Sequence, residues 1–213
     1  MKLCPLAAAA LMLSACATKP PPPPLLAITA RDCRATPDLT GAIALSLKEK
    51  DADPVQETFD ETTPCFSPAP GIGSLYRVFA LPDVPDPLVV SIRSTPFGQG
   101  VFAPHVTVLD AKGAPLREIS HQQFMFRGET LSVLFRSHPG DRYLLIASDP
   151  TALGHGISRI EERTQSYMAA AGNAYFSVHT GSDATQHLVF TANGQVTIAI
   201  RRLVTSPPQA VQG

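Results

Sequence analysis

The sequence predicts an all-β domain, an antiparallel β-sandwich of the immunoglobulin-like or jelly-roll-like kind, with one inserted helix near residues 157–171. Two observations predict the sheets: short apolar runs bounded by proline or glycine follow residue 71, and several of them alternate with a period of two. A third observation predicts the helix, because residues 156–172 lack proline and carry helix-forming residues.

The predicted strands are short and regularly spaced. In the segment "PLVVSIRS", Leu88, Val90 and Ile92 fall on one face of an extended chain. We expect that face to be buried and the opposite face to meet solvent. Further short apolar runs occupy residues 74–81, 103–110 and 129–136, and residues 141–148 contain a near-continuous apolar run.

The strongest turn signal lies near the C-terminal end, in "HLVFTANGQVTIAIRR" at residues 187–202. Two alternating runs flank Asn193 and Gly194, the pair that a two-residue type I′ hairpin turn favours. Val196, Ile198 and Ile200 share one face of the second run. The pattern predicts that the two runs pair with each other as a hairpin.

The inserted helix is predicted from "GISRIEERTQSYMAAAG". Glycine stands at both ends, and Gly172 suits the end of a helix. Apolar or weakly polar residues recur at helical spacing, which predicts one buried stripe: Ile157, Ile160, Thr164, Tyr167 and Met168.

The first residues predict an export signal followed by a lipid anchor. A single lysine precedes a short apolar run that is too short to cross a bilayer. The run ends in Leu-Ser-Ala-Cys, which resembles the lipobox of bacterial lipoproteins, so residues 1–15 are expected to be removed and Cys16 to be acylated. Ala17 favours the outer membrane, since an Asp there resembles the retention signal of the inner membrane. We therefore expect a periplasm-facing lipoprotein of the outer membrane.

The remaining boundaries follow from composition. Residues 16–30 are expected to be a tether, because Pro20–Pro24 favour a polyproline II rod or a simple low-complexity linker. Residues 31–70 are expected to form an N-terminal segment, residues 71–205 the sandwich and residues 206–213 a flexible tail.

Two cysteines remain after Cys4 and Cys16 are assigned to the leader and the lipid. Cys33 and Cys65 would lie in an oxidising periplasm, so a disulfide between them is expected. The alternative, a thiol pair that binds a metal, has little support because the spacing is long and no CxxC motif is present.

Composition and motifs argue against several classes of function. A net charge of −1 gives no electrostatic basis for nucleic-acid binding. The histidines form no HExxH motif, and no nucleophile elbow or phosphate-binding loop is present, so we expect no metal, no cofactor and no catalysis. A hydrolase that uses some of His105, His121 and neighbouring Ser or Asp residues remains the alternative with the least support.

Ligand binding is expected, if anywhere, in the glycine-containing loop "STPFGQGVFAP". Phe97 and Phe102 are the aromatic candidates there, because sugar-binding surfaces usually stack the apolar face of a sugar on an aromatic ring. Tyr167 is better explained by core packing. Tryptophan is absent from the chain.

Three segments resemble the maltose operon periplasmic protein (MalM) family: "GIGSLYRVFALPDVPDPLVVSIRS", "GVFAPHVTVLDAKGAPLREI" and "GDRYLLIAS". The matches to the family's patterns are Tyr76 to Pro82, Val101 to Asp110 and Tyr143 to Ala147. "TQSYMAAAGN" is similar to a family segment taken as a helix, and "SVHTGSDATQHLVF" is similar to a later one. The resemblance covers about residues 71–203.

The resemblance implies a non-enzymatic periplasmic protein associated with the uptake of maltose or maltodextrin. It transfers no catalytic residues. The chain differs from the family's pattern in its lipobox and in lacking a long C-terminal extension. Two hypotheses follow: an accessory of carbohydrate transport that binds a glycan or a transport component, or a structural or assembly lipoprotein that binds an envelope protein.

Overall fold

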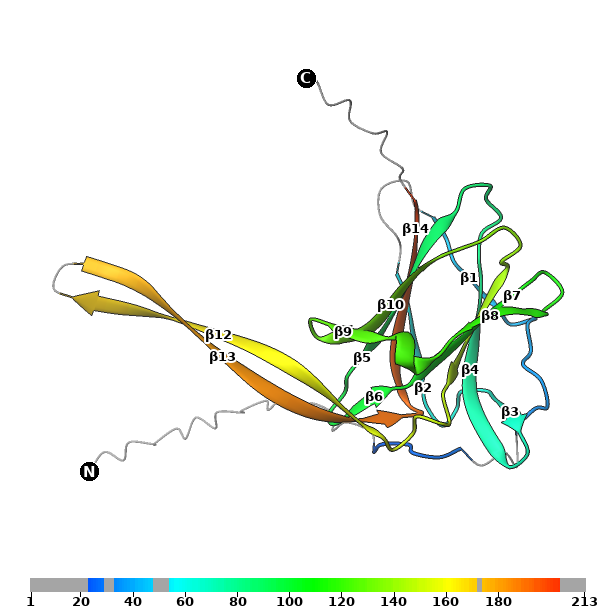
Figure 1. Cartoon of the computed structure of the whole chain (residues 1–213), viewed down its shortest axis with the longest axis horizontal. Helices are drawn as coiled ribbons and strands as arrows, with labels where there is room; N and C mark the ends of the chain where they lie inside the picture. The colour runs from blue at the N-terminus through cyan, green and yellow to red at the C-terminus, as the bar shows by residue number, and fades with distance from the viewer. Residues whose placement is uncertain (1–22, 29–32, 48–53, 172–173, 204–213) are drawn as a thin grey trace, which may run out of the picture.

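The structure is a computed structural model that describes residues 23–28, 33–47, 54–171 and 174–203, and it is all-β (Figure 1). Its strands are β1 (Ile43–Ala44), β2 (Val55–Phe59), β3 (Cys65–Ala69), β4 (Ile72–Ala80), β5 (Leu88–Thr95), β6 (Gly100–Phe102), β7 (Pro104–Leu109), β8 (Pro115–Ile119), β9 (Met125–Arg127), β10 (Thr130–Arg136), β11 (Tyr143–Ser148), β12 (Gly156–Ala171), β13 (Ala174–Thr191) and β14 (Gly194–Arg202). One short 3-10 turn, η2 (His121–Gln123), joins β8 to β9.

The described strands form three sheets. The first has the order β1-β4-β11-β7-β8, with β3 also paired to β4, and the second has the order β2-β14-β5-β10-β9. The third contains β12, β13 and β6. Most pairs are antiparallel, but β1 runs parallel to β4 and β6 runs parallel to β13.

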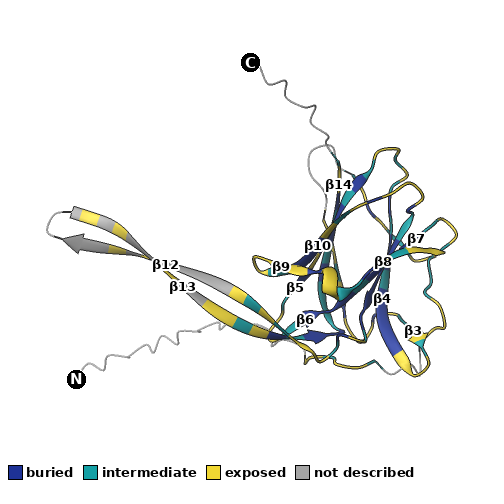
Figure 2. Ribbon diagram, viewed as in Figure 1, coloured by how far each residue is buried: buried dark blue, intermediate teal, exposed yellow. Residues whose placement is uncertain are grey.

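One hydrophobic core lies between the first two sheets, as the buried positions in Figure 2 show. The second sheet contributes the alternating residues of β5 and β14 that the sequence assigned to one face, and the first contributes alternating residues of β7 and β11. These side chains are all buried: Leu88, Val90, Ile92, Val106, Val108, Leu144, Ile146, Val196, Ile198 and Ile200. The period-two prediction is confirmed for β5, β7 and β14. β11 is buried at nearly every position, as its near-continuous apolar run predicts.

The predicted helix is wrong. Residues 157–171 lie in β12, which pairs along its whole length with β13 in a long antiparallel ribbon. Helix propensities differ by less than ~1 kcal/mol per residue, so cross-strand hydrogen bonds with the strand-forming segment 174–191 override them. Ala171 pairs with Ala174, which leaves two residues for the connection. Gly-Asn at positions 172 and 173 is a hairpin signal that favoured this alternative.

The predicted hairpin at Asn193 and Gly194 is also wrong. β13 and β14 belong to different sheets, because β13 pairs with β12 and β6 whereas β14 pairs with β2 and β5. Asn193 uses its side chain elsewhere: its amide oxygen accepts a hydrogen bond from the Leu25 backbone N–H at 2.8 Å, and its NH₂ donates to the Pro23 carbonyl at 2.9 Å. The chain therefore crosses between sheets at this point.

The N-terminal segment is integrated into the same body. Cys33 and Cys65 form the expected disulfide, which closes a sequence separation of 32 residues. Phe59 of β2 is buried in the core, and β3 pairs with β4. A second, smaller apolar cluster on the outer face of the first sheet includes Tyr76 and is covered in part by Leu39.

The predicted leader, the predicted acylation site Cys16, most of the predicted tether and the predicted tail at 206–213 lie outside the described residues. Within the described ranges, no helix has the length and apolar character needed to cross a bilayer.

Candidate functional site

Phe97 lies at the start of a tight turn that joins β5 to β6. Its backbone N–H donates to the Gly100 carbonyl at 2.9 Å, and the Gly100 N–H donates back to the Phe97 carbonyl at 3.1 Å. Gly98 has a φ of 62°, which glycine adopts without strain. The turn holds the Phe97 ring 54% exposed to solvent.

The ring borders a cleft of about 670 Å³, which we call the Phe97 cleft. This volume falls within the range of ~300–1,000 Å³ that small-molecule sites occupy. The cleft lies between the proline segment at the start of the described chain, the turn after β2 and the start of β14. Its lining residues are Pro23, Pro24, Leu25, Thr58, Phe59, Asp60, Glu61, Thr62, Thr95, Pro96, Phe97, Asn193, Gly194 and Gln195.

A row of polar residues crosses three strands beside the Phe97 ring. Gln195 of β14 is paired with Thr58 of β2 on one side and with Thr95 of β5 on the other. Directly paired residues project from the same face of a sheet, and their neighbours Phe59, Ser94 and Val196 are buried on the opposite face. The row therefore offers hydroxyl and amide groups on the outer face.

The cleft has a negative character. Asp60 and Glu61 line it, and no Lys, Arg or His appears among its lining residues in the described part of the chain. The Thr62 hydroxyl and backbone N–H donate to Asp60 at 2.6 and 2.9 Å, and these bonds, the hydroxyl bond first, lower the pKa of that carboxyl. The site thus suits neutral ligands with hydroxyl groups better than anions.

Phe102, the other aromatic candidate, is not a surface residue. Its side chain is fully buried, and its ring lies 4.3 Å from the Phe59 ring between centroids. Phe102 therefore packs in the core beneath the cleft, and the expectation of direct ligand contact does not fit its burial. The position of Tyr167 in β12 likewise places it in the long ribbon rather than on a helix.

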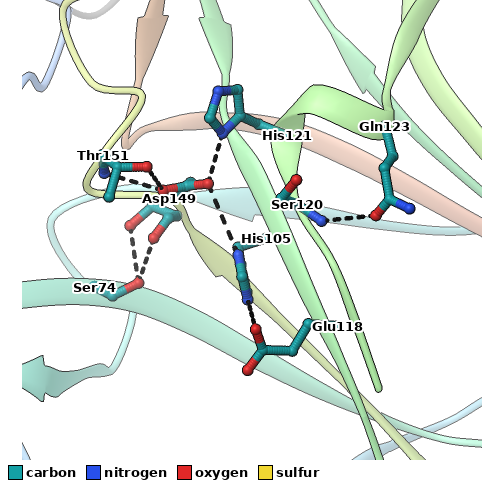
Figure 3. Close-up of polar contacts among 9 residues, drawn as sticks. Ser74, His105, Glu118, Ser120, His121, Gln123, Asp149 and Thr151 are labelled. Atoms are coloured by element: carbon teal, nitrogen blue, oxygen red, sulfur yellow. Dashed lines mark hydrogen bonds and ion pairs between the residues drawn. The ribbon is translucent and has the colours of Figure 1, made fainter.

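A cluster of titratable side chains lies elsewhere, around the buried carboxylate of Asp149 (Figure 3). His121 of η2 places Nδ1 at 2.6 Å from Asp149 Oδ2, and the Nδ1 of His105 on β7 lies 3.8 Å from the same oxygen. Thr151 donates to the other oxygen from its hydroxyl and its backbone N–H, at 2.6 and 3.0 Å. His105 also lies 3.6 Å from Glu118 of β8 through Nε2. We call these five residues the Asp149 cluster.

The cluster changes the titration of two of its members. Burial raises the pKa of Asp149, but the contacts from His105, Thr151 and His121 together outweigh burial and hold that pKa well below its usual range. The Asp149 carboxylate in turn raises the pKa of His105, against the opposing effect of burial. Asp149 is therefore ionised at neutral pH and favours a protonated His105.

The arrangement joins three parts of the fold. Asp149 opens the turn between β11 and β12, His121 belongs to the link between the two large sheets, and His105 stands on β7. The Asp149 N–H also donates to the Ala103 carbonyl at 2.8 Å. The cluster consequently fixes the root of the β12–β13 ribbon to the two large sheets.

The described contacts of the Asp149 cluster join two histidines to carboxylates and a threonine to Asp149. Among the described contacts, neither His105 nor His121 is hydrogen-bonded to a serine hydroxyl, and the Ser74 hydroxyl donates to the Ser148 carbonyl instead. A groove of about 620 Å³ lies beside the cluster. The described residues contain no group of three or more His, Cys, Asp or Glu side chains suited to hold a metal ion.

Sequence reasoning placed Phe97 on the surface but missed its surroundings. The Thr58–Gln195–Thr95 row depends on strand register, and residues 58 and 195 are distant in sequence. The meeting of His105, His121 and Asp149 depends on long-range packing in the same way. No local motif marks either group.

Comparison with curated proteins and with solved structures gives no match. The family described as maltose operon periplasmic protein precursor (MalM) matches residues 71–200. The matched region begins just before β4 and runs into β14, so it includes the β12–β13 ribbon, the Asp149 cluster and every described strand of the two large sheets except β1, β2 and β3. The chain belongs to the maltose operon periplasmic protein (MalM) family.

Proposed function

We propose that this protein is a non-enzymatic, periplasm-facing lipoprotein that assists carbohydrate uptake by binding a neutral glycan of the maltodextrin type in the Phe97 cleft. The family, associated by its description with the maltose operon and the periplasm, supports the carbohydrate connection. The observation that carries the site is an exposed aromatic ring beside a row of uncharged polar side chains.

The chemistry of a glucan matches this combination. The C–H faces of glucose units are apolar and stack on an aromatic ring, while the hydroxyl groups at the ring edge need donors and acceptors. Phe97 supplies the first surface, and Thr95 and Gln195 supply the second. A phosphorylated or acidic sugar would meet Asp60 and Glu61, which disfavours it.

Calorimetric titration of the full chain with maltodextrins of increasing length tests the proposal. Phe97→Ala should weaken binding at least about tenfold, since burying a phenylalanine contributes ~1.5–3 kcal/mol. Leu134→Ala is the matched control, because Leu134 is an exposed apolar side chain of β10 that does not line the cleft. Absence of heat with every glucan, or unchanged affinity in Phe97→Ala, would contradict the site.

His105→Gln separates the Phe97 cleft from the groove beside the Asp149 cluster. This variant should bind glucan as the wild type does, because His105 does not line the Phe97 cleft. A loss of binding in His105→Gln together with normal binding in Phe97→Ala would place the glycan in the other groove.

The proposed anchor at Cys16 has a direct test. A fatty-acid probe should label the wild-type protein in cells, and Cys16→Ser should abolish the labelling. Wild-type material that is fully soluble without detergent would refute acylation.

A second function, an assembly lipoprotein that binds an envelope protein, draws support from the β12–β13 ribbon. The ribbon projects from the two large sheets (Figure 2), and Ile160, Met168 and Tyr175 on it are exposed. A stable envelope complex recovered with the lipidated protein, at the same yield with and without maltodextrin, would favour this function over glycan binding.

A further inference from the structure

The distal half of the β12–β13 ribbon differs in composition from the rest of the chain. Residues 164–182 contain no Asp, Glu, Lys or Arg, although such residues make up 16% of the sequence. The ribbon's charged residues are confined to its proximal half: Arg159, Glu161, Glu162, Arg163 and Asp183. Two of the four tyrosines of the chain, Tyr167 and Tyr175, belong to the uncharged part.

Large apolar side chains are exposed on this ribbon. Ile160, Met168 and Tyr175 are 69%, 69% and 75% exposed, the highest values among the exposed large hydrophobic residues of the described chain. Met168 pairs with Ser177 and Tyr175 pairs with Ala170, so both large residues stand on the same face by the period of two.

The ribbon also lacks the support that a sheet normally gives. β12 pairs only with β13 among the described strands, and β6 reaches β13 only at Val189–Thr191 near the root. An isolated two-stranded ribbon is marginally stable in water, because it buries little apolar surface. Burial of the exposed apolar residues in a less polar environment than water would therefore stabilise the ribbon.

The chain enters the domain beside the root of the ribbon. The Leu25 carbonyl accepts a hydrogen bond from the Ala192 N–H at 2.7 Å, and Asn193 holds the backbone of Pro23 and Leu25. Pro23 is the seventh residue after Cys16, which bounds the reach of an anchored chain at about 25 Å. β12 has 16 residues, or about 50 Å at the rise of a strand. A tip carried by such a ribbon can reach the surface that holds the anchor.

We propose that the uncharged distal half of the β12–β13 ribbon inserts into the interfacial layer of the lipid bilayer. Tyrosine favours the membrane–water interface, and a surface that lacks Asp, Glu, Lys and Arg enters it without the cost of desolvating their charges. No described strand pairs with the outer edges of the distal ribbon, and outward backbone groups would lack partners in the hydrocarbon interior, so the insertion is shallow. The reach argument rests on the proposed anchor at Cys16, and the proposal does not depend on glycan binding.

The absence of tryptophan from the chain allows a direct measurement. Tyr175→Trp places a single fluorescent reporter on the distal ribbon, and Leu134→Trp places a matched reporter on the body at another exposed apolar position. Each full-length lipidated protein is mixed with phosphatidylethanolamine vesicles, with and without bromine on the acyl chains. We expect the Tyr175→Trp emission to shift to shorter wavelength and to be quenched by the brominated lipid, and the Leu134→Trp emission to stay unchanged.

A second variant separates ribbon insertion from acylation. In the Cys16→Ser full chain, flotation with the same vesicles should fall about tenfold or more when Met168→Lys and Tyr175→Lys are combined. Leu116→Lys combined with Leu134→Lys is the control and should leave flotation unchanged, since these exposed residues belong to β8 and β10 of the body. High salt should not alter binding, because the distal ribbon carries no fixed charge.

Several results would overturn the proposal. Unchanged Tyr175→Trp emission on vesicles would do so, as would failure of the Cys16→Ser chain to float. A spectral shift without lipid that grows with protein concentration would show instead that a second copy of the chain covers the ribbon. Phe97→Ala should leave all of these vesicle readouts unchanged, because Phe97 lies in the Phe97 cleft and not on the ribbon. A failure of the glycan proposal is therefore distinguishable from a failure of this one.

Discussion

Nδ1 of His121 lies 2.6 Å from Oδ2 of Asp149, which links the turn after β11 to the segment that joins the two large sheets. Both side chains are largely buried, and the His121 ring also packs edge-on against Phe190 of β13 at 5.5 Å between centroids. This contact links the root of the long ribbon to the two large sheets, so the stability of the domain should depend on it.

Asp149→Ala should lower the free energy of unfolding by about 3 kcal/mol. The substitution leaves the Thr151 N–H and hydroxyl and the His121 ring nitrogen without their acceptor inside the protein. Urea unfolding measures the change. Asp86→Ala is the matched control, because Asp86 pairs with Arg202 on the surface and its loss should cost less than ~1 kcal/mol. Equal losses in the two variants would contradict a structural role for the cluster.

Stability should depend on pH through His105. Its pKa is raised in the folded state, so its contribution is fully present below the unfolded value near 6.5 and is lost as pH rises through the folded value. Asp149, with a lowered pKa, stays ionised over this range. The stability difference between wild type and His105→Gln should therefore be larger at about pH 5 than at about pH 8.

The control for this measurement is His155→Gln, since His155 is exposed and lies in the turn before β12. Its effect on the unfolding free energy should be small at both pH values. A wild-type to His105→Gln difference that stays constant across the range, or that grows as pH rises, would refute the role given to His105.

Gly194→Ala should destabilise the domain by roughly 1–3 kcal/mol. An added Cβ would lie 2.8 Å from the Cβ of Phe102 and 3.3 Å from its backbone nitrogen, and a buried core residue cannot move aside easily. Thermal or urea unfolding detects the change. Gly41→Ala is the control, because an added Cβ there meets nothing within 4 Å. Equal stability of the two variants would show that the contact relaxes freely.

Phe97→Ala should change glycan affinity, whereas Phe102→Ala should change the free energy of unfolding. Phe97 is exposed, so its loss should reduce glycan affinity and leave stability within ~0.5 kcal/mol of wild type. Phe102 is fully buried against Phe59, so its loss should cost ~3–5 kcal/mol of stability. Calorimetric titration and urea unfolding of both variants test the pair. A stability loss in Phe97→Ala as large as that in Phe102→Ala would contradict the assignment.

Loss of the disulfide should lower stability by about 3–4 kcal/mol by the chain-entropy model, given the separation of 32 residues between Cys33 and Cys65. Combined Cys33→Ala and Cys65→Ala substitution measures this loss. Added reductant should destabilise the wild type toward the variant and leave the variant unchanged. An equal response of both proteins to reductant would contradict the assignment.

The sequence predicted the core of the fold because alternation is a local property. Leu88, Val90 and Ile92 are buried on one face as their spacing requires, and Val196, Ile198 and Ile200 meet them across paired strands. The ribbon was mispredicted because Glu, Arg, Gln, Met and Ala favour a helix only weakly, and the pairing partner in β13 decides the outcome. At Asn193–Gly194 the strands do end and begin where the turn signal places them. The predicted pairing of these two strands is wrong, because β13 and β14 belong to different sheets.

By itself, the sequence determined the all-β class, the alternating core strands and the resemblance to the MalM family, since each depends on residue type and local spacing. It also predicted the Cys33–Cys65 pair, because only these two cysteines remained for an oxidising compartment. The tertiary structure alone decided that residues 156–171 and 174–191 form a projecting ribbon, that Phe102 is buried while Phe97 borders a cleft, and that Asp149 joins His105 to His121. These features depend on strand register and on contacts between residues distant in sequence, which local patterns do not encode.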